Sequence, residues 1–332
     1  MHVPYASKKS WCKMERKLEG RDILSLKDFS REEIEFIFET AKKKEPIARS
    51  RSDILRDKVL GSLFFQSSTR TRLSHETAML RLGGSVTGWA EGSLSRAGDY
   101  MRETLADTAR TVQSYVDVVV MRHPQDGAPA IFAEYADIPV INAGDGRNEH
   151  PTQALLDLYT IWKERGKIDG LKVAIIGFMA DRVFHSFAYG LAKFDDIQLY
   201  LMCPEETRWP AFDRELEKLR LNFEYSERLE DIISELDVIN IVTSGLVTTT
   251  IFDLSEYGKI WTTTKRSPPQ YKLTLDKLKK GKKDLMVLHC LPRHDEVPTE
   301  IDNTPYAKYF IQPYNGLVTR MALLALVLGR TS

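Results

Sequence analysis

The sequence has few cysteines, no net charge and no long apolar run. Its three cysteines are odd in number and far apart, without a CxxC pair. A disulfide framework and a zinc ribbon are therefore disfavoured, and a reducing cytoplasm is the expected location. Lys plus Arg and Asp plus Glu number 47 each, so no overall field favours nucleic acid or an anionic membrane, which leaves room only for a local basic pocket. No stretch reaches the ~18 apolar residues of a membrane helix, and the polar N-terminus has no secretory signal core.

Several motifs that mark common enzyme classes are also missing. The absence of GxxxxGK[ST] disfavours a P-loop kinase or ATPase, and the absence of GxSxG disfavours an acyl-serine esterase. Gly177 in IIGFMADR stands alone, so a nicotinamide-binding GxGxxG is not supported. The best metal-ligand pair would be His289 with Cys290, but neighbouring residues of a strand point to opposite faces. We therefore expect no catalytic metal and no nicotinamide cofactor.

Short apolar runs alternate with helical patterns along the chain, and its 332 residues predict about two domains. In the first half we expect strands at 59–65, 116–121 and 139–143, and helices at 31–43, 71–82, 103–115 and 128–135. In the second half we expect strands at 172–177, 198–203, 238–243 and 285–289, and helices at 151–165, 184–193, 209–220 and 317–328. This order predicts an α/β protein of two doubly wound, Rossmann-like parallel-sheet domains, joined by the interdomain helix after residue 150.

The densest group of hydrogen-bond donors is SSTRTR at 67–72, between a buried strand and a helix. Free amides at a helix N-terminus attract anions, hydroxyls add donors, and an arginine can bind a phosphate with two nitrogens. The alternative is a hydrophilic helix cap with solvated arginines. So many donors at the carboxyl end of a strand, where parallel sheets bind ligands, favour an anion site.

Four further polar loops follow predicted strands. They contain Arg122; then Asn142 to Gly146 with His150 and Gln153; then Asp181, Arg182 and His185; then 289–293. Each has an ordinary structural explanation, such as a solvated arginine or a capping histidine. Together they predict a small substrate with more than one acidic group. At a helix N-terminus, a neutral His150 could donate a hydrogen bond to a carbonyl oxygen.

Long, distinctive motifs run along most of the chain. They are SSTRTRLSHETAMLRLGG (67–84), ETLADT (103–108), DVVVMRHP (117–124), INAGDGRNEHPTQALLDL (141–158), HCLPRHDEV (289–297) and the terminal RMALLALVLG. In this order they resemble the aspartate/ornithine carbamoyltransferase family, and most of all the catalytic chain of its aspartate branch. The resemblance implies transfer of a carbamoyl group from carbamoyl phosphate to an amine, with release of phosphate and without a cofactor. It assigns 1–149, completed by the C-terminal helix 315–332, to carbamoyl phosphate and 150–314 to the amino-acid acceptor.

The resemblance also implies roles for individual residues. Those that would act directly on the phosphate and the carbonyl are Arg70, Thr71, Arg122 and His150. The full set that would bind carbamoyl phosphate is Ser68, Thr69, Arg70, Thr71, Arg122, His150, Gln153, Leu291 and Pro292. The candidates for the acceptor are Arg182, Lys265, Arg266, Leu291, Ser93 and Arg96. By the same resemblance the protein is a homotrimer whose subunits share active sites, and regulatory chains are left open.

The chain departs from the family pattern around the acceptor. The loop 93–103, where the family has a serine and a lysine, contains no lysine and offers Ser93, Ser95, Arg96 or Arg102 instead. The aspartate-binding T-R-x-Q is missing, and the region 261–270 supplies Lys265 and Arg266 instead; the S-M-G of the ornithine branch is replaced by TSG at 243–245. L-Aspartate is the expected acceptor. The alternatives are a different amino acid or amine, and a catalytically silent structural or regulatory homologue.

Overall fold

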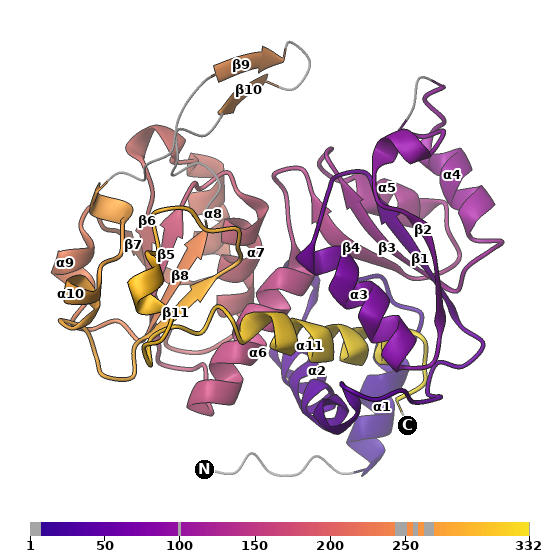
Figure 1. Cartoon of the computed structure of the whole chain (residues 1–332), viewed down its shortest axis with the longest axis horizontal. Coiled ribbons are helices and arrows are strands. Elements are labelled where there is room, and N and C mark those ends of the chain that lie inside the picture. Colours follow the sequence, from indigo (N-terminus) through magenta and orange to yellow (C-terminus); the bar gives the residue numbers. More distant parts are fainter. Residues whose placement is uncertain (1–7, 99–100, 243–250, 255–257, 262–268, 332) are drawn as a thin grey trace. The chain divides into compact units, whose positions relative to one another are not determined.

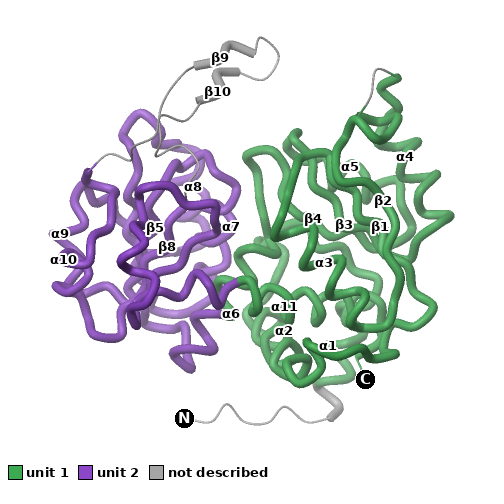
Figure 2. Tube along the Cα trace, in the orientation of Figure 1, with its two compact units in different colours: residues 1–159, 313–332 green, residues 160–312 purple. Residues whose placement is uncertain are grey.

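The computed structural model describes residues 8–98, 101–242, 251–254, 258–261 and 269–331, and the chain forms two compact units (Figures 1 and 2). Unit 1 comprises residues 1–159 and 313–332, and unit 2 comprises residues 160–312. The division falls inside helix α6 (Pro151–Arg165) and near the start of helix α11 (Gln312–Val327). The sequence-based boundaries were 149 and 314, and the ligand assigned to each domain stays a prediction.

Unit 1 contains four strands and most of the long helices. The strands are β1 (Val59–Phe64), β2 (Ser85–Trp89), β3 (Val118–His123) and β4 (Val140–Asp145). The helices before α6 are α1 (Lys8–Leu18), α2 (Arg31–Lys44), α3 (Arg70–Arg81), α4 (Leu105–Val112) and α5 (Ala128–Glu134). The predicted strands and helices are present to within a few residues, whereas β2 and α1 were not predicted.

The sheet of unit 1 is parallel, in the order β2-β1-β3-β4, and it is covered on both faces. Ser62 of β1 donates to Glu76 of α3 at 2.9 Å. Its neighbour Leu63 packs instead in a cluster with Ala109 of α4 and Phe132 of α5. Because adjacent strand residues point to opposite faces, α3 lies on one face and α4 and α5 lie on the other.

Unit 2 repeats this design with a larger sheet. Its parallel strands are β5 (Lys172–Gly177), β6 (Gln198–Met202), β7 (Asn222–Tyr225), β8 (Val238–Val242) and β11 (Met286–His289), in the order β11-β8-β5-β6-β7. A separate antiparallel pair consists of β9 (Ile251–Leu254) and β10 (Gly258–Trp261). The helices are α7 (Arg182–Leu191), α8 (Pro210–Lys218), α9 (Leu229–Ile232) and α10 (Leu275–Leu278). The predicted α/β class with two parallel sheets is confirmed, but β7, β9, β10, α9 and α10 were not predicted.

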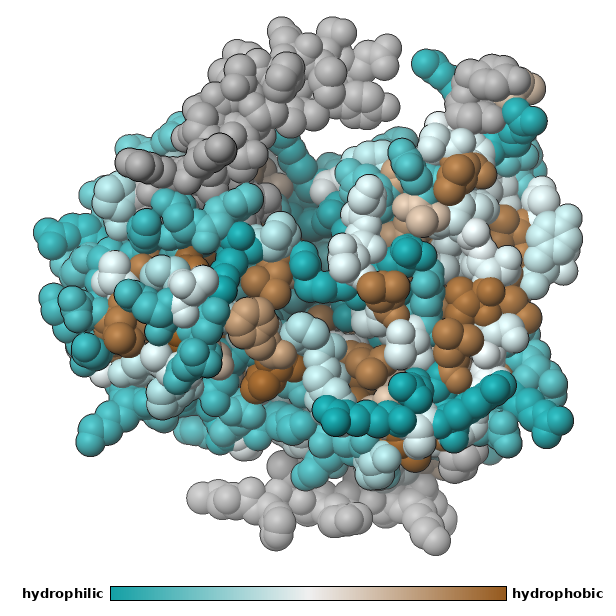
Figure 3. All heavy atoms as spheres, in the orientation of Figure 1, coloured by the Kyte–Doolittle hydropathy of each residue, from teal (hydrophilic) through white to brown (hydrophobic). Residues whose placement is uncertain are grey.

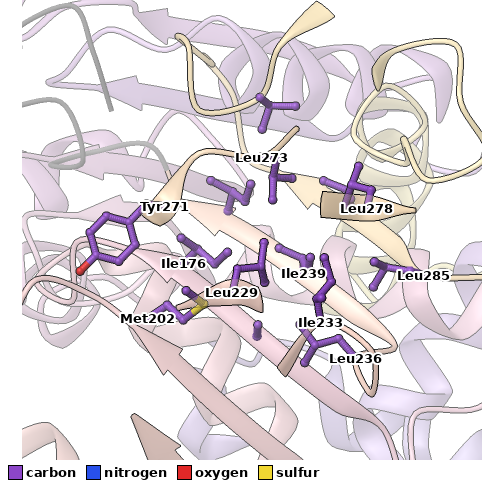
Figure 4. Packing of buried hydrophobic residues seen from close by; sticks show 14 of the residues in the cluster. Ile176, Met202, Leu229, Ile233, Leu236, Ile239, Tyr271, Leu273, Leu278 and Leu285 are labelled. Carbon is purple, nitrogen blue, oxygen red and sulfur yellow. The ribbon is translucent and has the colours of Figure 1, made fainter. Parts of the chain in front are cut away.

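One face of the second sheet carries a buried apolar cluster (Figure 4). The strand side chains Ile176, Met202 and Ile239 lie beside Leu229 of α9 and Leu278 of α10. Burial of such side chains contributes about 1.5–3 kcal/mol each, which holds the sheet rigid while polar loops leave its carboxyl edge. Among the described residues no helix is long and apolar enough to cross a membrane.

Helix ends are set by local chemistry that the sequence predicts. Ser30 and Glu33 form the reciprocal capping box at the start of α2, with Ser30 Oγ 3.3 Å from the Glu33 amide and Glu33 Oε2 2.8 Å from the Ser30 amide. At the end of α3, Gly83 takes φ +91° and a Cβ there would lie 2.3 Å from the Ser52 carbonyl oxygen. Only glycine fits this left-handed cap.

Candidate active site

The strand order of unit 1 changes direction between β1 and β3, which is the position where parallel sheets bind ligands. The chain passes from β1 to β2 on one side and then returns to β3 on the other. Helices on opposite faces therefore follow these strands, and the loops diverge at their carboxyl ends. Phe64, the last residue of β1, is in register with Arg122 of β3. The SSTRTR segment leaves β1 at this point, so the geometry brings two of the predicted polar groups together.

Three polar side chains meet near the carboxyl ends of β1 and β3. The Arg122 Nη2 atom lies 2.9 Å from Thr71 Oγ1 and 3.0 Å from His150 Nε2, and Thr71 Oγ1 lies 3.2 Å from His150 Nε2. Arg122 Nε donates to the Ala143 carbonyl at 2.9 Å, which fixes the plane of the guanidinium. All three side chains are at most 9% exposed. We call Thr71, Arg122 and His150 the donor cluster. Residues from β3, α3 and the start of α6 thus point donors at one spot.

The N-terminus of α3 adds a place for an anion. Thr69 occupies the cap position but makes no side-chain cap bond, and the first turn of α3 has no acidic residue. No hydrogen bond joins the Ser68 or Thr69 hydroxyl to another described residue, and Arg70 is exposed. The free amides and the helix dipole favour an anion there. Phosphate oxygens would find hydroxyls, amides and a guanidinium together.

The loop before α6 is anchored by buried carboxylates. Glu149 accepts from the Leu26 amide at 3.0 Å and from the Ser25 hydroxyl. Within α6, Gln153 Nε2 donates to Asp157 Oδ1 at 2.8 Å. Gln153 therefore does not cap the helix with its side chain in this arrangement, contrary to the simple capping alternative. The anchored loop fixes His150 beside the donor cluster.

Two buried ionisable groups near the donor cluster were missed by the sequence analysis. His75 donates through Nδ1 to the Thr71 carbonyl at 2.8 Å, and burial, with the nearby Arg320 and Arg122 charges, holds its pKa well below the usual value. Burial also lowers the pKa of Arg320 to about 9, opposed by the negative charge of Asp157. Arg320 therefore stays charged at neutral pH. In the sequence Arg320 is only the first residue of the motif RMALLALVLG, which indicated no role for it.

In unit 2 the corresponding switch of direction lies between β5 and β8. Asp181 caps α7 by accepting from the Val183 amide at 2.8 Å, and Arg182 is half-buried in the first turn. His185 belongs to the core, with its ring 4.9 Å from Phe212, so the prediction that it faces ligand is wrong. The loop after β8 lies outside the described residues, as do Lys265 and Arg266.

The last predicted loop, 289–293, contains one arginine that is paired within the protein and two residues that are partly exposed. Arg293 binds both carboxylate oxygens of Asp302, with Nη2 at 2.7 Å from Oδ2. Its prediction as a substrate-facing cation is therefore wrong, because its charge is already neutralised. Leu291 and Pro292 are joined by a cis peptide bond and are partly exposed. Their predicted contacts with substrate stay predictions.

The loop 93–103, which contains the acceptor candidates Ser93 and Arg96, belongs to unit 1. Ser93 and Arg96 are both exposed, around a short helix at Gly92–Leu94. They are not part of the donor cluster. Their predicted role in binding the acceptor stays a prediction.

Comparison with known families finds two matching domain descriptions that together cover most of the chain. The description "Aspartate/ornithine carbamoyltransferase, carbamoyl-P binding domain" matches residues 21–163, and "Aspartate/ornithine carbamoyltransferase, Asp/Orn binding domain" matches residues 169–327. The chain belongs to the aspartate/ornithine carbamoyltransferase family. Within that family, its curated relatives include the aspartate carbamoyltransferase catalytic subunits of Pyrobaculum arsenaticum and Thermococcus kodakarensis. The first is 45% identical, over 94% of this chain and 99% of the relative. The second is 46% identical, over 93% and 97%.

Solved structures of the family also match. Aspartate transcarbamoylase from Trypanosoma cruzi, in complex with aspartate and phosphate, superposes with a TM-score of 0.80 at 32% identity, over 94% of this chain and 96% of that one. The same enzyme with N-(phosphonacetyl)-L-aspartic acid gives a TM-score of 0.78 at 32% identity, over 94% and 98%. The resemblance predicted from the motifs is confirmed.

Proposed function

We propose that this protein transfers the carbamoyl group of carbamoyl phosphate to the amino group of L-aspartate, giving N-carbamoyl-L-aspartate and phosphate, a step of pyrimidine biosynthesis. The observation that carries the proposal is the donor cluster beside the free N-terminus of α3. Thr71, Arg122 and His150 lie within 3.2 Å of one another through their polar atoms. The relatives named as catalytic subunits of aspartate carbamoyltransferase support the same reaction. We place this reaction in the cytoplasm.

The chemistry requires stabilisation of one developing charge. The phosphate group lies against Ser68, Thr69 and Arg70. The carbonyl oxygen points at the donor cluster, with Gln153 orienting the carbamoyl NH₂. The amine nitrogen attacks the carbonyl carbon, the carbonyl oxygen becomes an oxyanion, and the C–O bond to phosphate then breaks. Each fixed donor on that oxyanion contributes about 3–4 kcal/mol. The leaving phosphate accepts the amine proton, so no covalent enzyme intermediate is needed.

The residues that we assign to the acceptor side are Arg182, Leu291, Ser93 and Arg96, together with Lys265 and Arg266, which lie outside the described residues. A lysine in place of an arginine changes the geometry of carboxylate binding, because a guanidinium binds two oxygens in a plane and an ammonium is a point charge. This departure favours one competing function, carbamoylation of a different amino acid or amine.

The acceptor is tested with purified protein, carbamoyl phosphate and a panel of amines that includes L-aspartate, D-aspartate, L-ornithine and L-asparagine. Phosphate release and the carbamoylated product are both measured. We expect turnover with L-aspartate and none with its D-enantiomer. Turnover of another amine with L-aspartate inert would contradict the assignment to aspartate. Silence with every amine would favour a non-catalytic homologue.

We also propose that the protein forms a homotrimer. Helix α3 exposes Leu73 and Leu80, at 49% and 53%, and their spacing of seven residues places them on one helical face. Apolar side chains also reach the surface of unit 1 on the face drawn in Figure 3. This exposure on one helical face supports the proposal that α3 contributes to a subunit interface, and Ser93 and Arg96 belong to the same unit. Light scattering that gives the mass of one chain would contradict this proposal.

A further inference from the structure

The proposed reaction leaves two fully buried polar side chains next to the donor cluster without a role. Thr152 of α6 and Arg320 of α11 are 0% and 2% exposed. Arg320 Nη2 donates to Thr152 Oγ1 at 3.5 Å, and Thr152 Oγ1 lies 3.5 Å from His150 Nδ1. Among the described residues, Arg320 Nε has no hydrogen-bond partner. Burial of a charge with so few partners lowers the free energy of unfolding. A buried Arg320 therefore indicates a role other than stability.

A neutral His150 can exist as either of two tautomers, with the proton on Nδ1 or on Nε2. The neutral ring has one N–H and one lone pair. Its Nε2 atom faces Arg122 Nη2 at 3.0 Å, and a guanidinium can only donate. With this contact, Nε2 accepts and Nδ1 carries the proton toward Thr152. The proposed reaction needs the opposite tautomer, because His150 has to donate a hydrogen bond from Nε2 to the substrate carbonyl oxygen.

A bound carbonyl oxygen reverses the preference. It accepts the Arg122 donor, and His150 can join only if its proton moves to Nε2. The Nδ1 lone pair then needs a donor, and the Thr152 hydroxyl is a side-chain donor within reach, at 3.5 Å. Because Arg320 donates to Thr152 Oγ1, its positive charge favours the rotamer that directs the hydroxyl proton away from the guanidinium, toward Nδ1. Both distances are 3.5 Å, at the long end for hydrogen bonds, and such bonds often tighten on ligand binding.

We propose that Thr152, oriented by Arg320 from the C-terminal helix, is a positioning residue that fixes the Nε2–H tautomer of His150 in the ligand-bound enzyme. This inference rests on the proposed function, since it requires a carbonyl oxygen at the donor cluster. It assigns a role in catalysis to α11, whose own residues touch no reacting atom.

The surroundings of Arg320 are shaped for this purpose. A Cβ on Gly316, one turn earlier in α11, would lie 2.7 Å from Arg320 Nη1 and 3.0 Å from Leu156 Cδ2. A side chain at position 316 would therefore require the Arg320 guanidinium to shift. Asp157 supplies a negative charge that opposes the burial of Arg320, and it also holds Gln153 at 2.8 Å. One carboxylate thus supports two parts of the site.

The tautomer can be measured directly by NMR of protein labelled with ¹⁵N-histidine, since protonated and unprotonated ring nitrogens differ strongly in chemical shift. The seven histidines are resolved by comparison with His150→Gln. N-(phosphonacetyl)-L-aspartate serves as the probe. We expect the wild-type protein to show Nε2–H with an unprotonated Nδ1 when the probe is bound. A bound wild-type protein with the proton on Nδ1 overturns the inference, whatever the variants do.

Matched variants separate positioning from packing. Thr152→Val removes the hydroxyl at nearly constant volume, and Thr152→Ser retains it. Thr319→Val is the control, because Thr319 is a buried threonine of α11 whose hydroxyl donates to the Asn315 carbonyl at 2.7 Å. We expect mixed tautomers in the probe-bound Thr152→Val protein, and the wild-type tautomer in Thr152→Ser and Thr319→Val.

The kinetic expectation is a split between kcat and KM. Loss of one neutral hydrogen bond that strengthens during the reaction should lower kcat about tenfold. KM for carbamoyl phosphate should change less than about twofold, since Thr152 does not contact substrate. An unchanged tautomer and an unchanged kcat in Thr152→Val would overturn the inference. If no variant, wild type included, shows any shift on addition of the probe, the proposed function fails instead.

Discussion

Replacement of Arg122 with methionine separates the catalytic from the structural role of the donor cluster. In the structure the guanidinium makes contacts of 2.9–3.0 Å with Thr71 Oγ1, His150 Nε2 and the Ala143 carbonyl. Methionine fills similar space but donates nothing, so the oxyanion loses one of three side-chain donors. The loss of one such donor costs about 3–4 kcal/mol in the transition state, which is a ~100- to 1000-fold lower kcat.

The cost to folding should be much smaller. The Ala143 carbonyl loses its Arg122 donor, which costs about 1–3 kcal/mol, but the protein no longer has to bury a charge at this position. We therefore expect the free energy of unfolding to change by no more than about 2 kcal/mol.

Steady-state phosphate release and urea unfolding measure the two effects in Arg122→Met. Arg110→Met is the matched control, because the Arg110 side chain is 61% exposed and its guanidinium lies 5.0 Å from the centre of the Tyr135 ring. The control should keep wild-type kcat. A kcat for Arg122→Met within tenfold of wild type would refute the oxyanion role, as would a loss confined to KM.

Three further predictions concern the phosphate site and the frame. Phosphate should raise the melting temperature of the wild-type protein, and Arg70→Ala should abolish this increase, because we propose the exposed Arg70 guanidinium as a direct phosphate ligand. Gly83→Ala should lower the free energy of unfolding by several kcal/mol more than Gly166→Ala, since both glycines have positive φ but only the Gly83 Cβ would meet a backbone atom, at 2.3 Å. The pKa of Glu296 lies below its usual value of 4.5. Burial alone would raise this pKa, but the hydrogen bonds from His289 and from backbone amides together lower it by more. Glu296→Gln should therefore destabilise the protein by about 1.5–3 kcal/mol at pH 7.

The sign of the Glu296 effect follows from linkage. A carboxyl whose pKa is lowered by folding stabilises the protein above its usual pKa, and that stability is lost as pH falls through the folded value. The difference between wild type and Glu296→Gln should thus shrink below about pH 4; a constant difference would contradict it. Arg70→Ala that still responds to phosphate would contradict the anion site. Equal destabilisation of the two glycine variants would contradict the proposed clash.

Much of the frame could be predicted because local chemistry fixes it. The bounds of β5 and α6 agree with the expected 172–177 and 151–165. Strand β2 was missed because Ser85–Trp89 is a half-exposed edge strand containing Gly88, a residue that disfavours strands. A Cβ on Gly88 would lie 2.1 Å from the Ser62 carbonyl oxygen, so this glycine is required by close packing that no single-strand pattern reveals.

Some contacts of the candidate site could likewise be predicted from the sequence, and others could not. Thr71 and Arg122 could be placed together from sequence, since both leave adjacent strands at their carboxyl ends. The contact of Arg320 with Thr152 could not, because the position of the last helix depends on packing between residues far apart in the chain. Arg293 was misassigned since its partner Asp302 lies on a later turn, and sequence gave no reason to pair them.

The most direct test of the central claim is a crystal structure of the protein with N-(phosphonacetyl)-L-aspartate. We expect the phosphonate to contact Ser68, Thr69 and Arg70 at the N-terminus of α3, and the neighbouring carbonyl oxygen to accept from the donor cluster. A complex in which this inhibitor binds elsewhere, with the start of α3 unoccupied, would contradict the account.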